Sequence, residues 1–423
     1  MPLTTVGSRL TAVMLLIIAT GSCKKDAAGP GDEPPLDPPF YTDPTPLSTQ
    51  LAFVQLGAGY HHTCAVTGAG AAWCWGWNEN ASLGTTDSMD TCGDALEGPL
   101  QCSGDPQPVS GGLAFAAVFP SLRHTCALRD DGAAFCWGNA GGLGSGHPTG
   151  PLPRPVAGDH RFAALSASLV DFVTCGLAAG GQAWCWGPDH PNRGGLGTGS
   201  RGDAPTPVAV AGDVRFVSLS VGEFHTCGVA TSGAASCWGG NWHGQLGVGS
   251  MGQEGGTMTT ILPALVLGDH TFTQVTAAVS HTCGLTPAGG VLCWGDGRPF
   301  GLASSATAPV VAATGIAFAS VHAGGRHTCG LTADGVAYCW GENDGGQLGD
   351  GSTEYRAEPT PVSGGLRFSA LTTGAGHTCG MATGGRAYCW GFNPYGQVGR
   401  RGSEADPEHP LPRFDTAPGR AYP

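Results

Sequence analysis

A chain of 423 residues, 41% of them hydrophobic, can bury a substantial core, which argues against a disordered polymer. Its 73 glycines, 32 prolines and 12% of charged residues suit many short strands joined by tight turns better than long surface helices. The net charge is −13 and the only lysines are Lys24 and Lys25, so the clustered cations of a nucleic-acid surface are missing. We therefore expect an all-β protein that binds no nucleic acid.

Residues 1–22 are predicted to be a signal peptide. Arg9 precedes an apolar run, Leu10–Thr20, that is too short to span a bilayer as a mature helix. Two small residues then precede Cys23, and this pattern resembles the bacterial lipobox, although Thr20 stands where that motif usually has Leu. The resemblance implies that Cys23 is lipidated and anchors the protein to the bacterial cell envelope, at the outer membrane or the cell surface. Secretion with cleavage nearby and an uncleaved anchor are the alternatives.

Residues 23–43 are expected to form a solvated tether, because they are rich in Pro and Asp and have few apolar side chains. The folded body is then expected to cover residues 44–423. The cysteine count agrees with this division: the chain has 17 cysteines, and setting Cys23 aside leaves an even number, enough for eight pairs. Such pairs persist in an oxidising compartment, which export would provide.

The body consists of seven repeats of one pattern. Six repeats have a segment of the form H-T-C and the third has V-T-C; in all seven a second cysteine follows after nine intervening residues, and then Trp-Gly. The predicted pairs are Cys64 with Cys74, Cys126 with Cys136, Cys175 with Cys185, Cys227 with Cys237, Cys283 with Cys293, Cys329 with Cys339, and Cys379 with Cys389.

A gap of nine residues places the two cysteines opposite each other in a hairpin with a three-residue loop. In the sixth repeat, the loop Ala333–Gly335 pairs Cys329 with Cys339 at a non-hydrogen-bonded position, where facing Cα atoms lie closest and a disulfide fits. The last residue of such a loop is usually left-handed, which favours glycine. The seven repeats have Gly70, Gly132, Gly181, Gly233, Gly289, Gly335 and Gly385 there. Zinc sites use shorter spacings such as C-x-x-C, so we predict seven disulfide-stapled hairpins.

Two further extended pieces accompany each hairpin, such as Phe216–Leu219 before one and Pro205–Val208 after another. Four strands in each of seven repeats predict radial blades. The motifs H-T-C…C-W-G…G-Q-L-G resemble the regulator of chromosome condensation repeat family over about residues 44–415. The resemblance implies a seven-bladed β-propeller, and the added cysteine pairs suit an exported branch. We hypothesise that Pro44–Ser48 completes the last blade and closes the ring.

Six repeats carry a histidine two places before the first cysteine, and the third repeat has Val173 instead. The histidines are His62, His124, His225, His281, His327 and His377. A ring of imidazoles could bind a metal. A residue that recurs in step with Thr, Cys and Trp is better explained by one internal hydrogen bond repeated in each blade, and the C-W-G tryptophans by blade packing. No metal site is predicted.

The first repeat contains the largest insertion, Thr85–Asp105, in which Cys92 and Cys102 form the eighth pair. Its acidic residues could ligate calcium but lack an EF-hand pattern, so an exposed, stapled recognition loop is favoured. A second insertion, Met251–Thr260, is rich in Gly and Met, and a tryptophan lies beside each insertion as a candidate contact anchor. The candidate partner-binding residues are Trp77, Asp87, Asp90, Asp94, Glu97 and Trp242.

No pattern predicts a catalytic site or a cofactor. The absence of lysine after position 25 excludes a P-loop or Schiff-base lysine, and no histidine precedes a glutamate, which excludes H-E-x-x-H.

We expect a monomeric, non-enzymatic binding scaffold that recognises a protein or glycan partner through loops on one propeller face. Its only membrane contact would be the lipid anchor. Some exported bacterial relatives of the fold inhibit other enzymes, so inhibition is one form of this function. The alternatives are an enzyme or enzyme subunit acting on carbohydrate or peptidoglycan and, least favoured, guanine-nucleotide exchange as in the nuclear protein that names the family.

Overall fold

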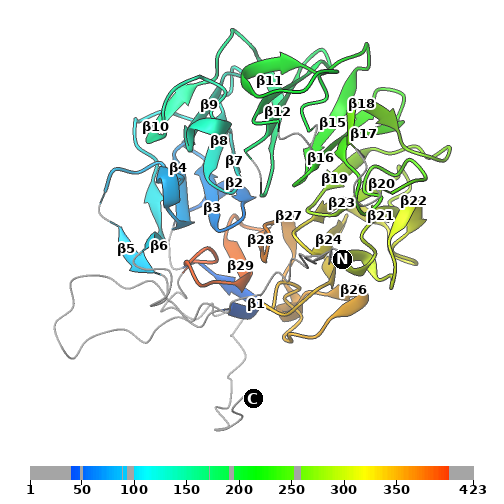
Figure 1. Cartoon of the computed structure of the whole chain (residues 1–423). Coiled ribbons are helices and arrows are strands. Elements are labelled where there is room, and N and C mark those ends of the chain that lie inside the picture. The colour runs from blue at the N-terminus through cyan, green and yellow to red at the C-terminus, as the bar shows by residue number, and fades with distance from the viewer. Residues whose placement is uncertain are drawn as a thin grey trace, which may run out of the picture.

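The computed structural model describes residues 40–47, 51–87, 89–92, 100–170, 172–189, 195–251 and 259–399. These residues form a ring of seven antiparallel sheets, the blades, around a central axis (Figure 1). The predicted signal peptide, Cys23 and most of the predicted tether lie outside the described residues. Within the ranges described, no helix has the length and apolar character needed to cross a membrane.

Each blade has four strands, and the first has a fifth. From the axis to the rim, blade 1 consists of β2 (Phe53–Ala58), β3 (His62–Thr67), β4 (Ala72–Trp77) and β6 (Leu100–Pro108), with β5 (Asp90–Cys92) outside β6. Blade 2 consists of β7 (Ala117–Pro120), β8 (His124–Leu128), β9 (Ala134–Gly138) and β10 (Gly150–Pro155). Blade 3 consists of β11 (Phe162–Ala167), β12 (Thr174–Ala178), β13 (Ala183–Gly187) and β14 (Ala204–Ala209).

The remaining blades repeat this order. Blade 4 consists of β15 (Phe216–Val221), β16 (His225–Ala230), β17 (Ala235–Gly240) and β18 (Thr259–Leu265). Blade 5 consists of β19 (Gln274–Ala277), β20 (His281–Leu285), β21 (Val291–Gly295) and β22 (Ala306–Val311). Blade 6 consists of β23 (Phe318–Ala323), β24 (His327–Thr332), β25 (Ala337–Gly341) and β26 (Arg356–Pro361). Short 3₁₀ helices occur in four connections: η1 (Glu79–Ala81), η2 (Ala140–Gly142), η3 (Arg298–Phe300) and η4 (Ser363–Gly365).

Blade 7 contains both ends of the described chain and closes the ring. Its strands β27 (Phe368–Thr373), β28 (His377–Ala382) and β29 (Ala387–Phe392) are completed by the N-terminal strand β1 (Phe40–Pro46), which pairs with β29. The hypothesis that the first P-x-P piece completes the last blade is therefore confirmed. The strand begins at Phe40, however, so residues 40–43 belong to the sheet and not to the tether in which we expected them.

The stapled hairpin is present in every blade. In blade 6, Cys329 faces Cys339 and Gly330 faces Tyr338, which is the register derived from the gap of nine. The seven loop glycines have φ between 78° and 86°, the left-handed conformation that the loop requires.

Each hairpin disulfide joins the two cysteines that the spacing paired. The Cα atoms of each pair lie 4.0–4.1 Å apart, as expected of non-hydrogen-bonded positions. From blade 1 to blade 7 the bonds join Cys64 to Cys74, Cys126 to Cys136, Cys175 to Cys185, Cys227 to Cys237, Cys283 to Cys293, Cys329 to Cys339, and Cys379 to Cys389.

Neighbouring blades are joined by the G-Q-L-G turns. In blade 6 the carbonyl of Gln347 accepts hydrogen bonds from Thr378 Oγ1 (2.9 Å) and Trp390 Nε1 (3.0 Å) of blade 7. Leu348 beside it is fully buried, as are all seven C-W-G tryptophans. The turn of one blade therefore packs on the tryptophan of the next, which confirms the predicted packing role of these tryptophans.

Gly349→Ala is expected to destabilise the protein by about 2–5 kcal/mol, because two costs combine. Gly349 has φ +68°, where an L side chain costs about 1–2 kcal/mol, and its added Cβ would lie 2.6 Å from Trp390 Nε1, an overpacking worth about 1–3 kcal/mol more. Gly364→Ala is the matched control, since Gly364 has φ +83° with nothing within 4 Å of an added Cβ. Chemical denaturation that found equal losses in the two variants would contradict this role of the turn.

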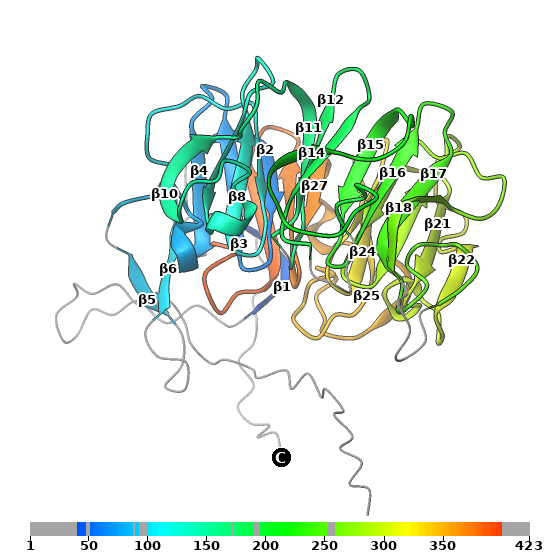
Figure 2. The ribbon, with the colours of Figure 1, turned by 45° about the horizontal axis from the view of Figure 1, so that its top comes forward.

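The ring has two unlike faces. The hairpin face carries the seven three-residue hairpin loops, such as Gly68–Gly70, and the links between blades. The loop face carries the turns between the first and second strands, such as Gly59–His61, and the connections between the third and fourth strands, which include both insertions. Because β1 runs antiparallel to β29, Phe40 also lies on the loop face, and Figure 2 shows β1 and β5 at the same side of the ring.

Candidate functional site

Six buried histidines connect neighbouring blades on the loop-face side. Each Nε2 lies 2.7–3.1 Å from the hydroxyl of the H-T-C threonine in the next blade. The pairs are His62–Thr125, His124–Thr174, His225–Thr282, His281–Thr328, His327–Thr378 and His377–Thr63. The repeated hydrogen bond predicted for these histidines exists, and it crosses from blade to blade.

The direction of these hydrogen bonds fixes the tautomer of the histidines. The hydroxyl of Thr125 donates its one proton to the carbonyl of Ser82 (2.9 Å), so its oxygen must accept from the Nε2–H of His62. The pKa of His62 is lowered to about 3, mainly by burial and to a smaller extent by the nearby His124 and His377. The imidazoles are therefore neutral hydrogen-bond donors, with a structural role in the ring.

The third blade interrupts the ring of histidines. Its turn between the first and second strands is longer than the corresponding turn of blade 4. The backbone N–H of Ser168 donates to the carbonyl of Val173 with four residues between them, whereas the N–H of Gly222 donates to the carbonyl of His225 with only two between them. Val173 occupies the histidine position, and among the described residues no histidine crosses from blade 3 to Thr226 of blade 4. The longer turn could have been found from the sequence by counting, in each blade, the residues between the first strand and the segment that contains the first cysteine.

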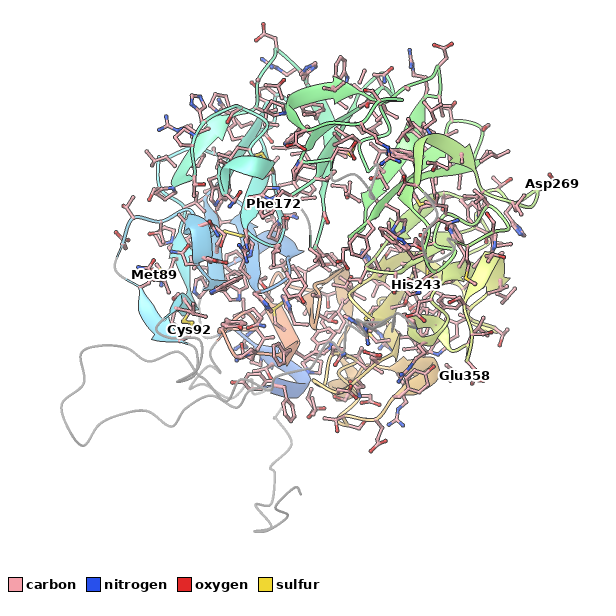
Figure 3. All side chains as sticks on the ribbon, in the orientation of Figure 1. Met89, Cys92, Phe172, His243, Asp269 and Glu358 are labelled. Atoms are coloured by element: carbon pink, nitrogen blue, oxygen red, sulfur yellow. A yellow bond between two sulfur atoms is a disulfide. The ribbon has the colours of Figure 1, made fainter. Side chains whose placement is uncertain are left out.

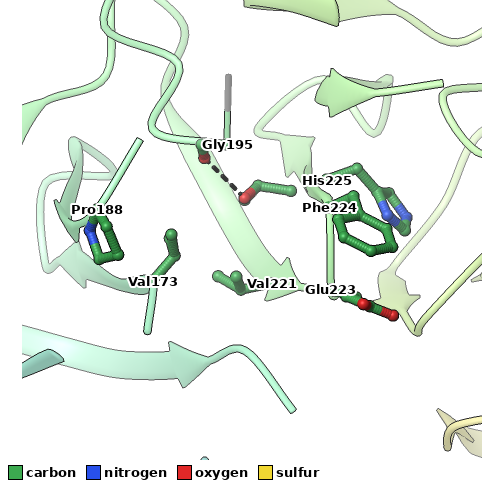
Figure 4. Close-up of a pocket in the computed structure, with 9 residues that line it drawn as sticks. Val173, Pro188, Gly195, Val221, Glu223, Phe224 and His225 are labelled. Carbon is green, nitrogen blue, oxygen red and sulfur yellow. Dashed lines mark hydrogen bonds between the residues drawn. The ribbon is translucent and has the colours of Figure 1, made fainter. Parts of the chain in front are cut away.

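A pocket lies at this interrupted junction between blades 3 and 4, which we call the 3/4 seam (Figure 4). The side chains of Val173, Pro188, Val221 and Phe224 provide apolar walls, and Glu223 is the acidic residue of the lining. The space between these atoms amounts to about 230 Å³, part of it open to solvent.

An aromatic cluster occupies the loop face where blades 7 and 1 meet. It consists of Tyr60, His61, Trp77 and Tyr395, with the His61 ring 4.3 Å from Tyr60, 5.4 Å from Trp77 and 4.6 Å from Tyr395 between centroids. Trp77 and Tyr395 stack at 5.7 Å. The pKa of His61 is lowered to about 3, mainly by burial and to a smaller extent by the nearby His377, His62 and Arg123, so this ring is uncharged.

Arg123 of blade 2 extends the cluster. Its guanidinium lies 5.8 Å from the centroid of the Trp77 ring and forms an ion pair with Glu79 at 3.1 Å. The sequence did not single out Tyr60, His61, Tyr395 or Arg123, because the cluster exists only once the ring has closed.

The eighth disulfide lies against the same cluster. Cys92 and Cys102 are bonded, and they pack with Tyr395, Trp77 and Leu100. Strand β5 pairs with β6, so the predicted stapled loop is an extra hairpin at the rim of blade 1, where Figure 3 labels Cys92.

The structure separates the six candidate partner-binding residues. Trp77 is half-buried in the aromatic cluster, whereas Trp242, on blade 4, is 37% exposed and packs edge-on against Phe224 at 5.0 Å. Asp87 is exposed and the backbone of Asp90 lies in β5. Asp94 and Glu97 lie outside the described residues. In the part of the chain that the structure describes, no group of three or more His, Cys, Asp or Glu could hold a metal.

The seven antiparallel sheets define a seven-bladed β-propeller, in which the G-Q-L-G turns join neighbouring blades. The family described as Regulator of chromosome condensation (RCC1) repeat matches residues 53–81, 318–347, 334–381 and 368–397. Blades 1, 6 and 7 of this chain thus match the repeat of that family, and every blade carries a disulfide.

Known proteins share the sequence pattern and the fold. The chain is 28% identical over 287 residues to RCC1 domain-containing protein RUG3, mitochondrial, of Arabidopsis thaliana, covering 64% of this chain and 61% of that protein. Human WBSCR16 has a similar structure, with a TM-score of 0.70, 18% identity, and coverage of 86% of this chain and 93% of that chain. Prp20p from Saccharomyces cerevisiae, described together with its binding to Gsp1p and histones, gives a TM-score of 0.64, 19% identity, and coverage of 79% and 81%. The structural likenesses establish the fold.

Proposed function

We propose that the protein is a binding scaffold of the cell envelope that recognises a protein partner with its loop face. One observation carries this proposal: the features that break the sevenfold repetition gather on that face. They are the stapled β5–β6 hairpin, the aromatic cluster and the longer turn of blade 3. The hairpin face, in contrast, repeats one loop conformation seven times. Variation on a rigid repeat scaffold is the usual place of recognition.

The chemistry of the loop face favours a protein partner. Aromatic side chains and arginine dominate the energetics of protein interfaces, and Trp77, Tyr395 and Arg123 are held in place by their mutual contacts before any partner binds. Prp20p, which shares this fold, is described with protein partners. A glycan partner remains the second option, since stacked aromatic rings also suit sugars.

Export is the natural setting for this scaffold. The eight disulfides of the described residues suit an oxidising compartment, and lipidation of Cys23 would hold the ring at the envelope through residues 24–39. We propose that the protein acts as a monomer without catalysis of its own. The competing function is an enzyme or enzyme subunit acting on carbohydrate or peptidoglycan.

Two arginines of blade 2 provide a matched test. Arg123 lies on the loop face against Trp77, whereas Arg129 is exposed at the hairpin loop on the opposite face. In pull-downs from envelope extracts, Arg123→Ala should reduce recovery of the partner at least about tenfold, the effect of losing an interface hot spot, and Arg129→Ala should leave it unchanged.

Both variants should first show the wild-type melting temperature and eight bridges by non-reducing mass spectrometry. Equal recovery with both variants would place the binding surface elsewhere. Turnover of glycans by the purified protein, with no partner recovered, would favour the enzyme.

A further inference from the structure

We propose that the outer edge of blade 5 binds an extended, apolar segment of a partner protein, which pairs with β22 as a fifth strand. This edge lies at the rim of the ring (Figure 1), apart from the loop face, so the contact goes beyond the function proposed above.

Prolines close the outer edge of most blades. One position of each outer strand faces the residue before the second hairpin cysteine, as Pro361 faces Tyr338. The next residue, Val362, donates its N–H to Ala337 of the third strand, so the backbone groups of position 361 point away from the sheet. Proline has no N–H to offer there, which opposes further pairing. Four blades have proline at this position: Pro46, Pro108, Pro155 and Pro361.

Blade 5 lacks this proline. Val311 occupies the position in β22, opposite Leu292, and Ala312 after it donates to the carbonyl of Val291. The N–H and C=O of Val311 therefore point outward, and in the part of the chain that the structure describes neither has a hydrogen-bond partner. Val311 is also 63% exposed. A strand placed along this edge can exchange two hydrogen bonds with Val311.

The open edge continues at Ala313, two residues further on. In five other blades the equivalent N–H donates to a carbonyl of the connection between the third and fourth strands, at 2.7–2.9 Å, as Leu267 does to Gly247. Blade 5 has the shortest such connection, built around η3, and within the described residues Ala313 N–H has no such acceptor. It offers a second donor on the same side of the strand.

The chemistry of this edge favours an apolar segment. Residues 299–325 contain no Asp, Glu, Lys or Arg, although the chain has a net charge of −13. Leu302 near the edge is 37% exposed, in addition to Val311. In contrast, the outer strand of blade 6 carries Arg356 and Glu358. A charged side chain brought against β22 would lose water without gaining an ionic partner.

Blade 1 shows that this propeller accepts a fifth strand. Strand β5 pairs with residues 100–102 of β6, ahead of Pro106 and Pro108. A second copy of the chain suits the blade 5 edge less well, because both copies are acidic and a short edge buries far less than the roughly 1,200–2,000 Å² of a stable interface. A segment of a partner that is also held by the loop face needs no such area, since linkage raises its effective concentration.

The pairing can be measured with a peptide, without knowing the partner. The probe is the fluorescein-labelled heptapeptide Thr-Val-Thr-Val-Thr-Val-Thr-amide, and anisotropy follows its binding to the intact protein. We expect saturable binding. A peptide that pairs along one edge uses the N–H groups of alternate residues only. Of two derivatives, one N-methylated on the valines and one on the inner threonines, one should therefore bind and the other should not.

Val311→Pro should weaken peptide binding at least about tenfold, because it removes the outward N–H. The fold already accepts proline at this position in four blades, so the variant should keep the wild-type melting temperature. Val311→Thr retains the N–H and should bind within about twofold of the wild type.

Leu265→Pro is the matched control, since it makes the same change in blade 4 at a position that is 65% exposed. It should leave binding unchanged, because the edge of β18 is already bonded on both sides of Leu265. The carbonyl of Ile261 accepts from Gly199 and the N–H of Leu267 donates to Gly247, both at 2.9 Å.

Wild-type binding by Val311→Pro, or loss of binding by Leu265→Pro alone, would overturn the proposal. Binding that appears only after removal of residues 400–423 would make the chain's own C-terminal segment the occupant, and a dimer that Val311→Pro dissociates would make it a second copy. Either result would also overturn it. Arg123→Ala should leave peptide binding unchanged, so a failure here is distinguishable from a failure of the loop-face function.

Discussion

Removal of residues 40–47 is expected to lower the melting temperature by roughly 10 °C, because these residues close the ring. Tyr41 and Leu47 are both 3% exposed in a core cluster that includes residues of blades 6, 7 and 1, and burying two such side chains contributes about 4 kcal/mol. The strand also accepts a hydrogen bond at Thr42 from the Gly351 N–H of blade 6, at 3.0 Å. Without it, β29 would be an exposed edge and blade 6 would lose a contact across the seam.

The control for this deletion removes residues 26–33, which shortens the chain by the same length and leaves β1 intact. That variant should melt at the wild-type temperature. A synthetic peptide of residues 38–49 should restore much of the lost stability when added to the 40–47 deletion. An unchanged melting temperature for that deletion would show that β1 contributes little to closure.

Acidification below about pH 6.5 is expected to destabilise the protein steeply. The native pKa values of the six ring histidines are lowered to about 3 by burial, against 6.5 for an exposed histidine. Between these two values the unfolded chain binds protons that the folded chain cannot, so stability falls as the pH falls. Each histidine removes about 1.4 kcal/mol per pH unit in this window. Denaturant unfolding without reductant, between pH 7.5 and 4.5, measures the slope.

His124→Val isolates one member of the ring, and it copies the residue that blade 3 has at position 173. The variant should be less stable than the wild type at pH 7.5 but lose about 1.4 kcal/mol less per pH unit below pH 6.5. The exposed His147 provides the control, because His147→Val should keep the wild-type slope. A His124→Val slope equal to that of the wild type would show that this histidine already titrates freely in the folded protein.

The regular part of this fold was predictable because it depends on short-range spacing. A gap of nine residues and a glycine at the third loop position determine the register in which Cys329 meets Cys339. Recurrence in step with the cysteines also predicted that the histidines are structural. Ring closure was predictable for a similar reason, since the first P-x-P piece lacked a hairpin of its own.

The irregular part depends on contacts that no local pattern encodes. Trp77 meets Tyr395 only because closure brings blade 7 against blade 1, so the sequence showed Trp77 as a lone anchor. The pocket at the 3/4 seam could not be predicted from one repeat alone. The sequence showed that Val173 replaces a histidine, but only the structure shows that Val173 and Thr226 of the next blade line the same pocket. The candidate partner-binding residues Asp94 and Glu97 lie outside the described residues, and their role stays a prediction.

The order of the cysteines also bears on how the protein matures. Every disulfide of the described residues joins a cysteine to the next one along the chain, with a sequence separation of 10 in all eight cases. An oxidase that joins thiols in the order in which they emerge from a translocation channel would thus make the native set directly, without later reshuffling. This holds only if Cys23, which precedes Cys64 in the chain, takes no part in the pairing, because otherwise every subsequent pair would shift by one. Acylation of that thiol would therefore protect the pairing of all the others.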